Sequence, residues 1–137
     1  MTGERLLIAA ELIEAMLQAA RDAAPEECCG LLVGTSGRVT RLVSARNVHD
    51  TPHRFFTVDP AAQFALLREL RERGGEEELL GHYHSHPSGP AEPSPRDLAE
   101  ANDSALFWLV IDPVKNEIGA FRVRLGDSFD RVTIETA

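Results

Sequence analysis

The sequence predicts an α+β or α/β fold built on a mixed β-sheet, and three observations favour this fold class. Short apolar runs, continuous or alternating, recur along the chain as they do in strands. Two segments have the apolar spacing of helices and lie on either side of the middle strand candidates. The chain has 137 residues, 43% of them hydrophobic and 26% charged. These proportions are typical of a globular domain, so we expect one domain over residues 1–137.

The elements expected in the N-terminal half are, in order, a strand over residues 6–8, a helix over 11–23, and strands over 31–33, 39–43 and 54–58. The helix has an apolar stripe from Leu12 to Ala23, and we expect it to end before Pro25. Gly34-Thr35-Ser36-Gly37 is a turn signal that joins two of the strands. Residues 47–60 show no helical period, which predicts a loop that leads into the short strand.

The elements expected in the C-terminal half are a helix from Pro60 to Gly74, a strand over 79–86, a short helix opened by 94–97, and strands over 106–111, 118–125 and 131–134. Asp59 precedes Pro60 as an N-cap precedes a proline at the first helical position. We expect Phe64, Leu67 and Leu70 to face inward. Residues 87–95 hold four of the eight prolines and predict a rigid loop.

The net charge of −8 and the two cysteines exclude several classes of protein. A nucleic-acid-binding domain needs clustered Lys and Arg, which this acidic composition does not favour. No apolar run approaches the roughly 20 residues of a membrane-spanning helix, and residues 1–5 lack the pattern of a signal peptide. Cys28 and Cys29 are neighbours with no third cysteine to pair with, so we expect free thiols and a reducing, cytoplasmic location.

Three histidines alternate along the strand candidate over residues 79–86. His82, His84 and His86 occupy every second position, so their side chains project from the same face of a strand. Such positions lie about 6.5–7 Å apart along the backbone, and two imidazoles from them can converge on one ion. Asp97 follows the proline-rich loop. A carboxylate that joins two imidazoles leaves the open coordination position of a catalytic zinc site.

Spacing alone leaves alternatives open at each of these positions. Cys28 and Cys29 offer thiolates to a structural metal site with four protein ligands. Ser94 and Asp97 also have the spacing of a capping pair at a helix start, and a capping hydroxyl keeps a proton to donate elsewhere. A catalytic metal needs a nearby acid to take a proton from water, and spacing does not choose among three candidates: Glu26, Glu27 and Glu92.

Two stretches, His84-Ser85-His86-Pro87 and Ser94-Pro95-Arg96-Asp97, together read H-x-H-x7-S-x2-D. Upstream lies the stretch Pro25-Glu26-Glu27-Cys28-Cys29-Gly30-Leu31-Leu32. This combination resembles the JAMM (MPN-domain) metalloproteases, and in particular their small stand-alone prokaryotic members. The resemblance extends over most of the chain, because Asn47…Arg54-Phe55, Asp59-Pro60 and the strand over 106–110 also look familial.

The resemblance implies roles for five residues. His84, His86 and Asp97, rather than His82, match the ligands of one Zn²⁺ per chain. Glu27 matches the glutamate that takes a proton from the attacking water. Ser94 matches the hydroxyl that stabilises the tetrahedral intermediate. The resemblance also implies an α+β fold of the cytidine-deaminase-like type, with a mixed, curved sheet flanked by helices and the metal at one edge of the sheet.

The implied activity is zinc-dependent hydrolysis of amide or isopeptide bonds. Family members like this one act on ubiquitin-like sulfur-carrier proteins that end in Gly-Gly, and release an amino acid or a protein from that tail. A chain of 137 residues leaves little room for the insertions with which larger deubiquitinases hold ubiquitin, so we expect a small carrier as substrate. The alternatives are a non-catalytic MPN-type scaffold and a metallopeptidase that acts on other small peptides. Glu92 adds a second acid to the loop and is expected to tune or obstruct the site.

Overall fold

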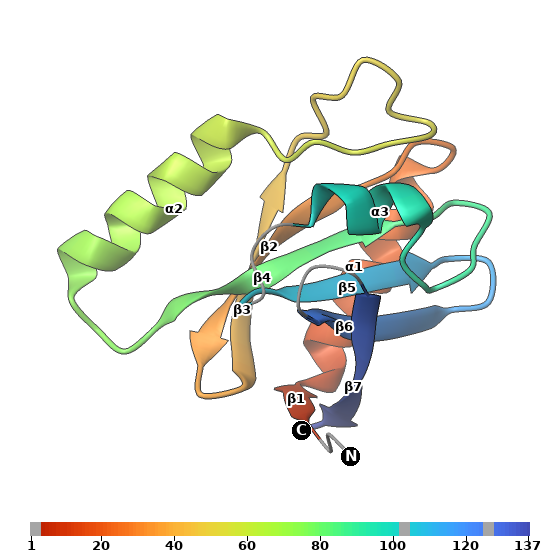
Figure 1. Cartoon of the computed structure of the whole chain (residues 1–137). Coiled ribbons are helices and arrows are strands. Elements are labelled where there is room, and N and C mark those ends of the chain that lie inside the picture. The colour runs from red at the N-terminus through yellow and green to blue at the C-terminus, as the bar shows by residue number, and fades with distance from the viewer. Residues whose placement is uncertain (1–3, 102–104, 125–127) are drawn as a thin grey trace.

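The computed structural model describes residues 4–101, 105–124 and 128–137. Within these residues, seven strands form a closed barrel in the order β1-β3-β2-β4-β5-β6-β7 (Figure 1). The strands are β1 (Arg5–Ile8), β2 (Cys29–Thr35), β3 (Arg38–Ala45), β4 (Glu78–Ser85), β5 (Phe107–Asp112), β6 (Glu117–Arg124) and β7 (Ser128–Thr136). β1 is parallel to both β3 and β7, and β4 is parallel to β5, while the other four pairings are antiparallel.

The α+β class and the mixed sheet are confirmed, but the sheet closes into a barrel where we expected a curved sheet with the metal site at its edge. Closure depends on β1, which places Leu7 beside Arg38 of β3 and also beside Glu135 of β7. Because this short strand joins the two ends of the sheet, the described strands leave no free edge. His84 and His86, which we expected to hold a metal at a sheet edge, lie instead where β4 ends within the closed sheet.

Helix α1 (Ala10–Ala23) supplies part of the main hydrophobic core. Its stripe buries Met16, Leu17 and Ala20 against residues of the barrel strands that include Leu109. The helix ends where expected, just before Pro25. Burial of these side chains, at about 1.5–3 kcal/mol for a fully buried large apolar residue, ties the helix to β4 and β5.

Helix α2 (Pro60–Arg73) begins and ends as expected but buries a different face. Asp59 caps it by accepting a hydrogen bond from the backbone N–H of Ala61, and it ends at Gly74 with a φ of 64°. The prediction that Phe64 and Leu67 face inward is wrong, because they are 73% and 43% exposed.

The residue that α2 buries is Leu66, which packs with Leu31 and Val33 of β2, and Leu70 lies partly buried beside it. The helix carries apolar residues on two sides, so the sequence pattern allows either side to be buried. In the structure the side with Leu66 and Leu70 packs against the barrel, and the side with Phe64 and Leu67 is exposed. Figure 1 shows α2 standing out from the barrel along much of its length. No helix in the described part of the chain is long and apolar enough to span a membrane.

The strand predicted over residues 54–58 does not form. Residues 46–59 are a loop with one isolated bridge, Asn47 to Val58. The Asn47 side chain instead binds the carbonyl of Phe55 and the N–H of Thr57. The remaining strands form close to their predicted places, mostly longer than expected, although residue 125 of one prediction lies outside the described residues. The short helix α3 (Pro95–Glu100) follows the proline-rich loop as expected.

Candidate metal centre

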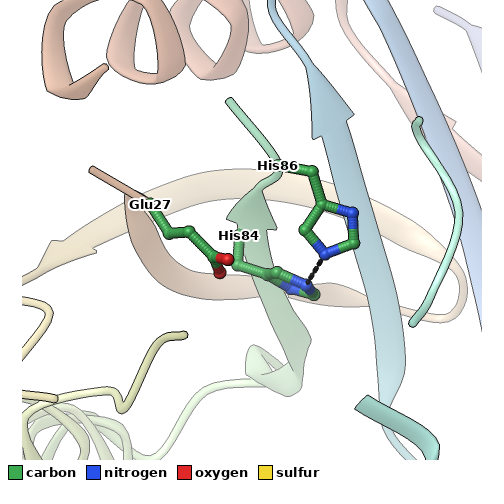
Figure 2. Close-up of side chains that lie close together, drawn as sticks. All are labelled: Glu27, His84 and His86. Atoms are coloured by element: carbon green, nitrogen blue, oxygen red, sulfur yellow. Dashed lines mark hydrogen bonds between the residues drawn. The ribbon is translucent and has the colours of Figure 1, made fainter. Parts of the chain in front are cut away.

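The last residues of β4 bring two imidazoles together. His84 lies between Cys29 of β2 and Val110 of β5 in the sheet, and His86 follows the end of the strand. The backbone N–H of His86 donates to the carbonyl of Ile111 at 2.8 Å, which continues the pairing with β5 for one more residue. The two side chains therefore project the same way, as the alternation predicted, and their Nε2 atoms lie 3.2 Å apart (Figure 2).

Asp97 of α3 completes a triangle with these two nitrogens. Its Oδ2 lies 3.2 Å from Nε2 of His84 and 3.3 Å from Nε2 of His86. Ligands about 2.0–2.1 Å from a tetrahedral zinc ion stand roughly 3.3 Å from one another. The three sides of the triangle match this spacing, so the donor set fits one zinc-like ion and leaves a fourth position open.

Each ring has contacts that bear on the form in which it would bind a metal. Nδ1 of His86 lies 3.0 Å from the Pro90 carbonyl and donates to it, which leaves Nε2 as the lone-pair nitrogen. His84 is fully buried and its ring stacks on Phe56, with centroids 4.1 Å apart and planes 13° apart. Burial lowers the pKa of His84, so its ring stays neutral.

The pKa of His86 is raised above 6.5. Burial acts to lower it, but the hydrogen bonds to Asp97 and to the Pro90 carbonyl and the charge of Asp97 outweigh burial. The same partners act on Asp97 in the opposite sense. Burial acts to raise its pKa, but the contacts with His84 and His86 hold that pKa well below its usual range. Asp97 is therefore a carboxylate near neutral pH, as a metal ligand has to be.

His82 is separated from this group although it shares the face of the strand. Its ring packs edge-on against Trp108, with centroids 4.3 Å apart, and lies 5.7 Å from the ring of Phe56. Burial lowers the pKa of His82 to about 3, so it is an uncharged part of an aromatic wall.

Glu27 is the acid that the structure brings to the histidines. One ligand atom from each of Glu27, His84 and His86 lies within 4.8 Å of the others, and Figure 2 shows the carboxylate of Glu27 directed toward His84. Glu27 is 7% exposed, and burial raises its pKa to about 7, with a further rise from Asp97 and an opposing effect of His86. A carboxylate with this pKa is a stronger base than an ordinary glutamate near neutral pH.

The two other acids that spacing left open lie elsewhere. Glu26 is exposed although it is the neighbour of Glu27. Glu92 lines the cleft above the site, but its side chain is 63% exposed and stands 3.9 Å from the guanidinium of Arg131. An exposed pair at this distance contributes little to stability.

Ser94 and Asp97 form the capping pair that the sequence offered as an alternative. Ser94 Oγ accepts a hydrogen bond from the backbone N–H of Asp97 at 3.0 Å, and Asp97 Oδ2 accepts one from the backbone N–H of Ser94 at 2.8 Å. The cap and the metal triangle are compatible because both use the same orientation of the Asp97 carboxylate. The cap occupies an acceptor site of the Ser94 hydroxyl and leaves its proton available to donate.

The thiolate alternative gains no support from the structure. Sγ of the buried Cys29 points toward the carbonyls of Ala45 and Arg46, at 3.8 and 3.6 Å. Burial raises the pKa of Cys29 to about 12, which disfavours the thiolate that a metal requires. Cys28 packs against the main core, and in the described part of the chain neither thiol belongs to a metal-ligand group.

An open cleft of about 630 Å³ leads to the site. Glu27, His86 and Asp97 line its inner part, and the proline-rich loop and Phe55 form its walls. The guanidinium of Arg96 lies 4.2 Å above the ring of Phe55, so α3 and the loop over residues 46–59 contact each other beside the cleft. A peptide in this cleft would meet Glu27, His86 and Asp97 together.

Three residues to which the sequence assigned no role also shape the site. Phe56 supports the ring of His84, Ser85 Oγ accepts a hydrogen bond from the N–H of Cys28 at 2.8 Å, and Asn47 binds the carbonyl of Glu27. Ser85 could have been suspected from its position between the two histidines on the opposite face. The loop that carries Phe56 and Asn47 has no local signal for these contacts, because their partners are distant in sequence.

Comparisons with known proteins place these features in a family. A family model described as prokaryotic homologs of the JAB domain matches residues 9–125. A probable TtuB-protein conjugate cleaving protease of Thermus thermophilus is 45% identical over 78 residues, which are 57% of this chain and 51% of that protein. A desampylase of Haloferax volcanii is 32% identical over 82% of this chain and 84% of that protein.

A CysO-cysteine peptidase of Mycobacterium tuberculosis is 30% identical over 86% of this chain and 82% of its own length. Among solved structures, the solution structure of a protein from Desulfitobacterium hafniense is 32% identical to this chain and superposes with a TM-score of 0.83. That match covers 96% of this chain and 92% of the solved chain. The match to the Thermus protein, in contrast, spans only about half of that protein.

Proposed function

This chain belongs to the family of prokaryotic homologs of the JAB domain, and from this premise we propose that it is a zinc peptidase for ubiquitin-like sulfur-carrier proteins. The reaction is hydrolysis of the amide or isopeptide bond that follows the Gly-Gly C-terminus of the carrier. The observation that carries the proposal is the triangle of His84 Nε2, His86 Nε2 and Asp97 Oδ2, with the buried carboxylate of Glu27 beside it.

The metal in this proposal is one Zn²⁺ per chain, held by His84, His86 and Asp97. Two imidazoles and one carboxylate are a known ligand set of catalytic zinc, and the sides of the triangle suit a tetrahedral ion. When bound, zinc supplies Lewis acidity, which makes a water molecule acidic enough to lose a proton near neutral pH and polarises a carbonyl group.

Glu27 and Ser94 supply the proton transfers and the charge stabilisation. Glu27 takes the proton from the attacking water and passes it to the nitrogen of the leaving amine. Its buried carboxylate, with a pKa of about 7, suits both directions of transfer near neutral pH. Ser94 donates its hydroxyl proton toward the carbonyl oxygen as negative charge develops there. Its place in the helix cap holds this hydroxyl next to Asp97.

The substrate class follows from the relatives. The names of three of them refer to TtuB-protein conjugates, to desampylation and to CysO-cysteine, and this chain covers most of two of these proteins. The cleft of about 630 Å³ is open at the surface, as the removal of a group from a protein tail requires. We assign the whole activity to one domain, and the free thiols Cys28 and Cys29 support a reducing, cytoplasmic location.

The test uses a ubiquitin-like sulfur carrier whose Gly-Gly C-terminus is extended by a short peptide. Wild-type protein is expected to contain one zinc by elemental analysis and to cleave after the second glycine, as located by mass spectrometry. Glu27→Gln is expected to keep the zinc and to lose nearly all cleavage, which leaves only a small residual rate. Glu26→Gln is the matched control, because the same change at the exposed neighbour should leave the rate unchanged.

Each result decides between the proposal and its alternatives. Zinc-free wild-type protein that cleaves nothing would favour a scaffold. Cleavage at the wild-type rate by Glu27→Gln would refute the assigned base. Cleavage of unrelated short peptides, with no cleavage of the carrier fusion, would favour a peptidase with a different substrate.

A further inference from the structure

The backbone of Glu27 is fixed from outside the strand that follows it. Glu27 precedes β2, so its peptide groups have no partners in the strand pairings. Its N–H donates to the carbonyl of Pro52 at 2.8 Å, and its carbonyl accepts a hydrogen bond from Nδ2 of Asn47 at 2.9 Å. Both polar groups of the Glu27 backbone are therefore bound by the loop over residues 46–59.

Asn47 uses both ends of its amide to organise this loop. Nδ2 also donates to the carbonyl of Phe55 at 3.0 Å, while Oδ1 accepts from the N–H groups of His49 at 3.1 Å and Thr57 at 3.0 Å. These contacts fix the orientation of the amide, because exchanging its oxygen and nitrogen would oppose carbonyl to carbonyl and donor to donor. One side chain thus joins several backbone groups of the loop to the backbone of Glu27.

We propose that Asn47 is a positioning residue that holds the carboxylate of Glu27 at the catalytic centre, an inference that rests on the proposed role of Glu27 as the base. Asn47 is not among the described residues that line the cleft, so it acts through Glu27 rather than on the substrate. The Glu27 side chain has three rotatable bonds, and its tip reaches the site only if its Cα is held in place. Proton transfer is sensitive to such placement, and an error of about 1 Å can cost on the order of 10²-fold in rate.

The identity of the residue follows from the contacts. An aspartate at position 47 keeps an acceptor for the N–H groups of His49 and Thr57 but loses the donor to Glu27 and Phe55. An alanine loses both. The two variants therefore separate what the donor does for Glu27 from what the acceptor does for the loop.

The test measures kcat and KM of Asn47→Asp and Asn47→Ala on the carrier with the extended Gly-Gly tail, together with zinc content. We expect kcat to fall about 10-fold to 10²-fold, with KM within twofold and one zinc per chain. Asn116→Asp is the matched control: it makes the same change at an exposed turn, keeps the acceptor for Arg21, and should leave kcat unchanged.

A double variant distinguishes positioning of Glu27 from general damage. If Asn47 acts through Glu27, adding Asn47→Asp to Glu27→Gln should lower the residual rate no further than Glu27→Gln does alone. A further loss of 10-fold or more in the double variant would overturn the inference, as would wild-type kcat in both single variants.

Circular dichroism and zinc content complete the set of outcomes. An unfolded Asn47→Asp or Asn47→Ala would also overturn the inference, because Asn47 would then serve the fold as a whole. Loss of zinc from a folded variant would overturn it as well, because Asn47 would then support the residues that hold the metal rather than Glu27. If Glu27→Gln itself keeps the wild-type rate, the proposed function fails, and this result is distinct from a failure of the Asn47 inference alone.

Discussion

The buried carboxylate of Glu27 should destabilise the metal-free protein, and replacing it by glutamine should make that protein more stable. Burial raises the pKa of Glu27 from 4.5 to about 7. Between these pH values the native state keeps a proton that the unfolded state has lost. Stability therefore falls as pH rises through this range, and the full cost is present above pH 7.

The magnitude follows from the size of the shift. One pKa unit corresponds to 1.36 kcal/mol, so a rise from 4.5 to about 7 corresponds to about 3 kcal/mol. Because the cleft gives solvent some access to the carboxyl group, the cost should be smaller than the full shift implies, and we expect about 2–3 kcal/mol. Glutamine has nearly the same shape and no charge, so Glu27→Gln should remove this cost at high pH and change little at low pH.

The assay is urea unfolding of chelator-treated protein at several pH values from 5 to 8. The stability difference between Glu27→Gln and wild type should grow with pH and level off above pH 7. Glu26→Gln provides the control, because a change at an exposed side chain is worth about 0.5 kcal/mol or less at any pH. A difference that stays constant from pH 5 to 8, or a Glu27→Gln protein less stable than wild type at pH 8, would refute the reasoning.

Three further predictions test the site and the fold. Asp97→Asn should lower the zinc content of the purified protein, measured by elemental analysis, because the amide removes an anionic ligand; full retention of zinc would argue against the triangle as the metal site. Ser94→Ala should lower kcat by about 10²–10³-fold and the free energy of unfolding by about 1 kcal/mol. A loss of stability with unchanged kcat would mean that Ser94 serves only as the helix cap. Leu66→Ala should cost about 2–5 kcal/mol in urea unfolding but Leu67→Ala about 0.5 kcal/mol or less, and equal losses would contradict the face that α2 buries.

The parts of the site that could be predicted are those that lie close together in the sequence. His84 and His86 share a face because they are two apart in a strand, and this geometry follows from the backbone alone. Ser94 and Asp97 are three apart at a helix start, so their reciprocal capping follows from helix geometry. The spacing did not choose Glu27 as the base. That choice came from the family resemblance, and in the structure Glu27 lies beside His84 and His86.

The parts that could not be predicted depend on contacts between distant segments. The alternating face of β4 also carries His82, and only the packing of Trp108 and Phe56 separates it from the other two histidines. The short strand expected over residues 54–58 had suitable residues. However, the side chain of Asn47 binds the backbone there, and the segment stays a loop.

The sequence by itself determined the α+β class, the order of most helices and strands, and the short motifs that carry the histidines, the aspartate and the serine. Periodicity, capping and turn residues act within a few positions, so these features can be derived without the rest of the chain. The tertiary structure decided which acid meets the histidines, which face of α2 is buried, and that β1 closes the sheet by pairing with β7. These outcomes depend on pairings between segments far apart in the chain, such as Cys29 with His84, which no local pattern encodes.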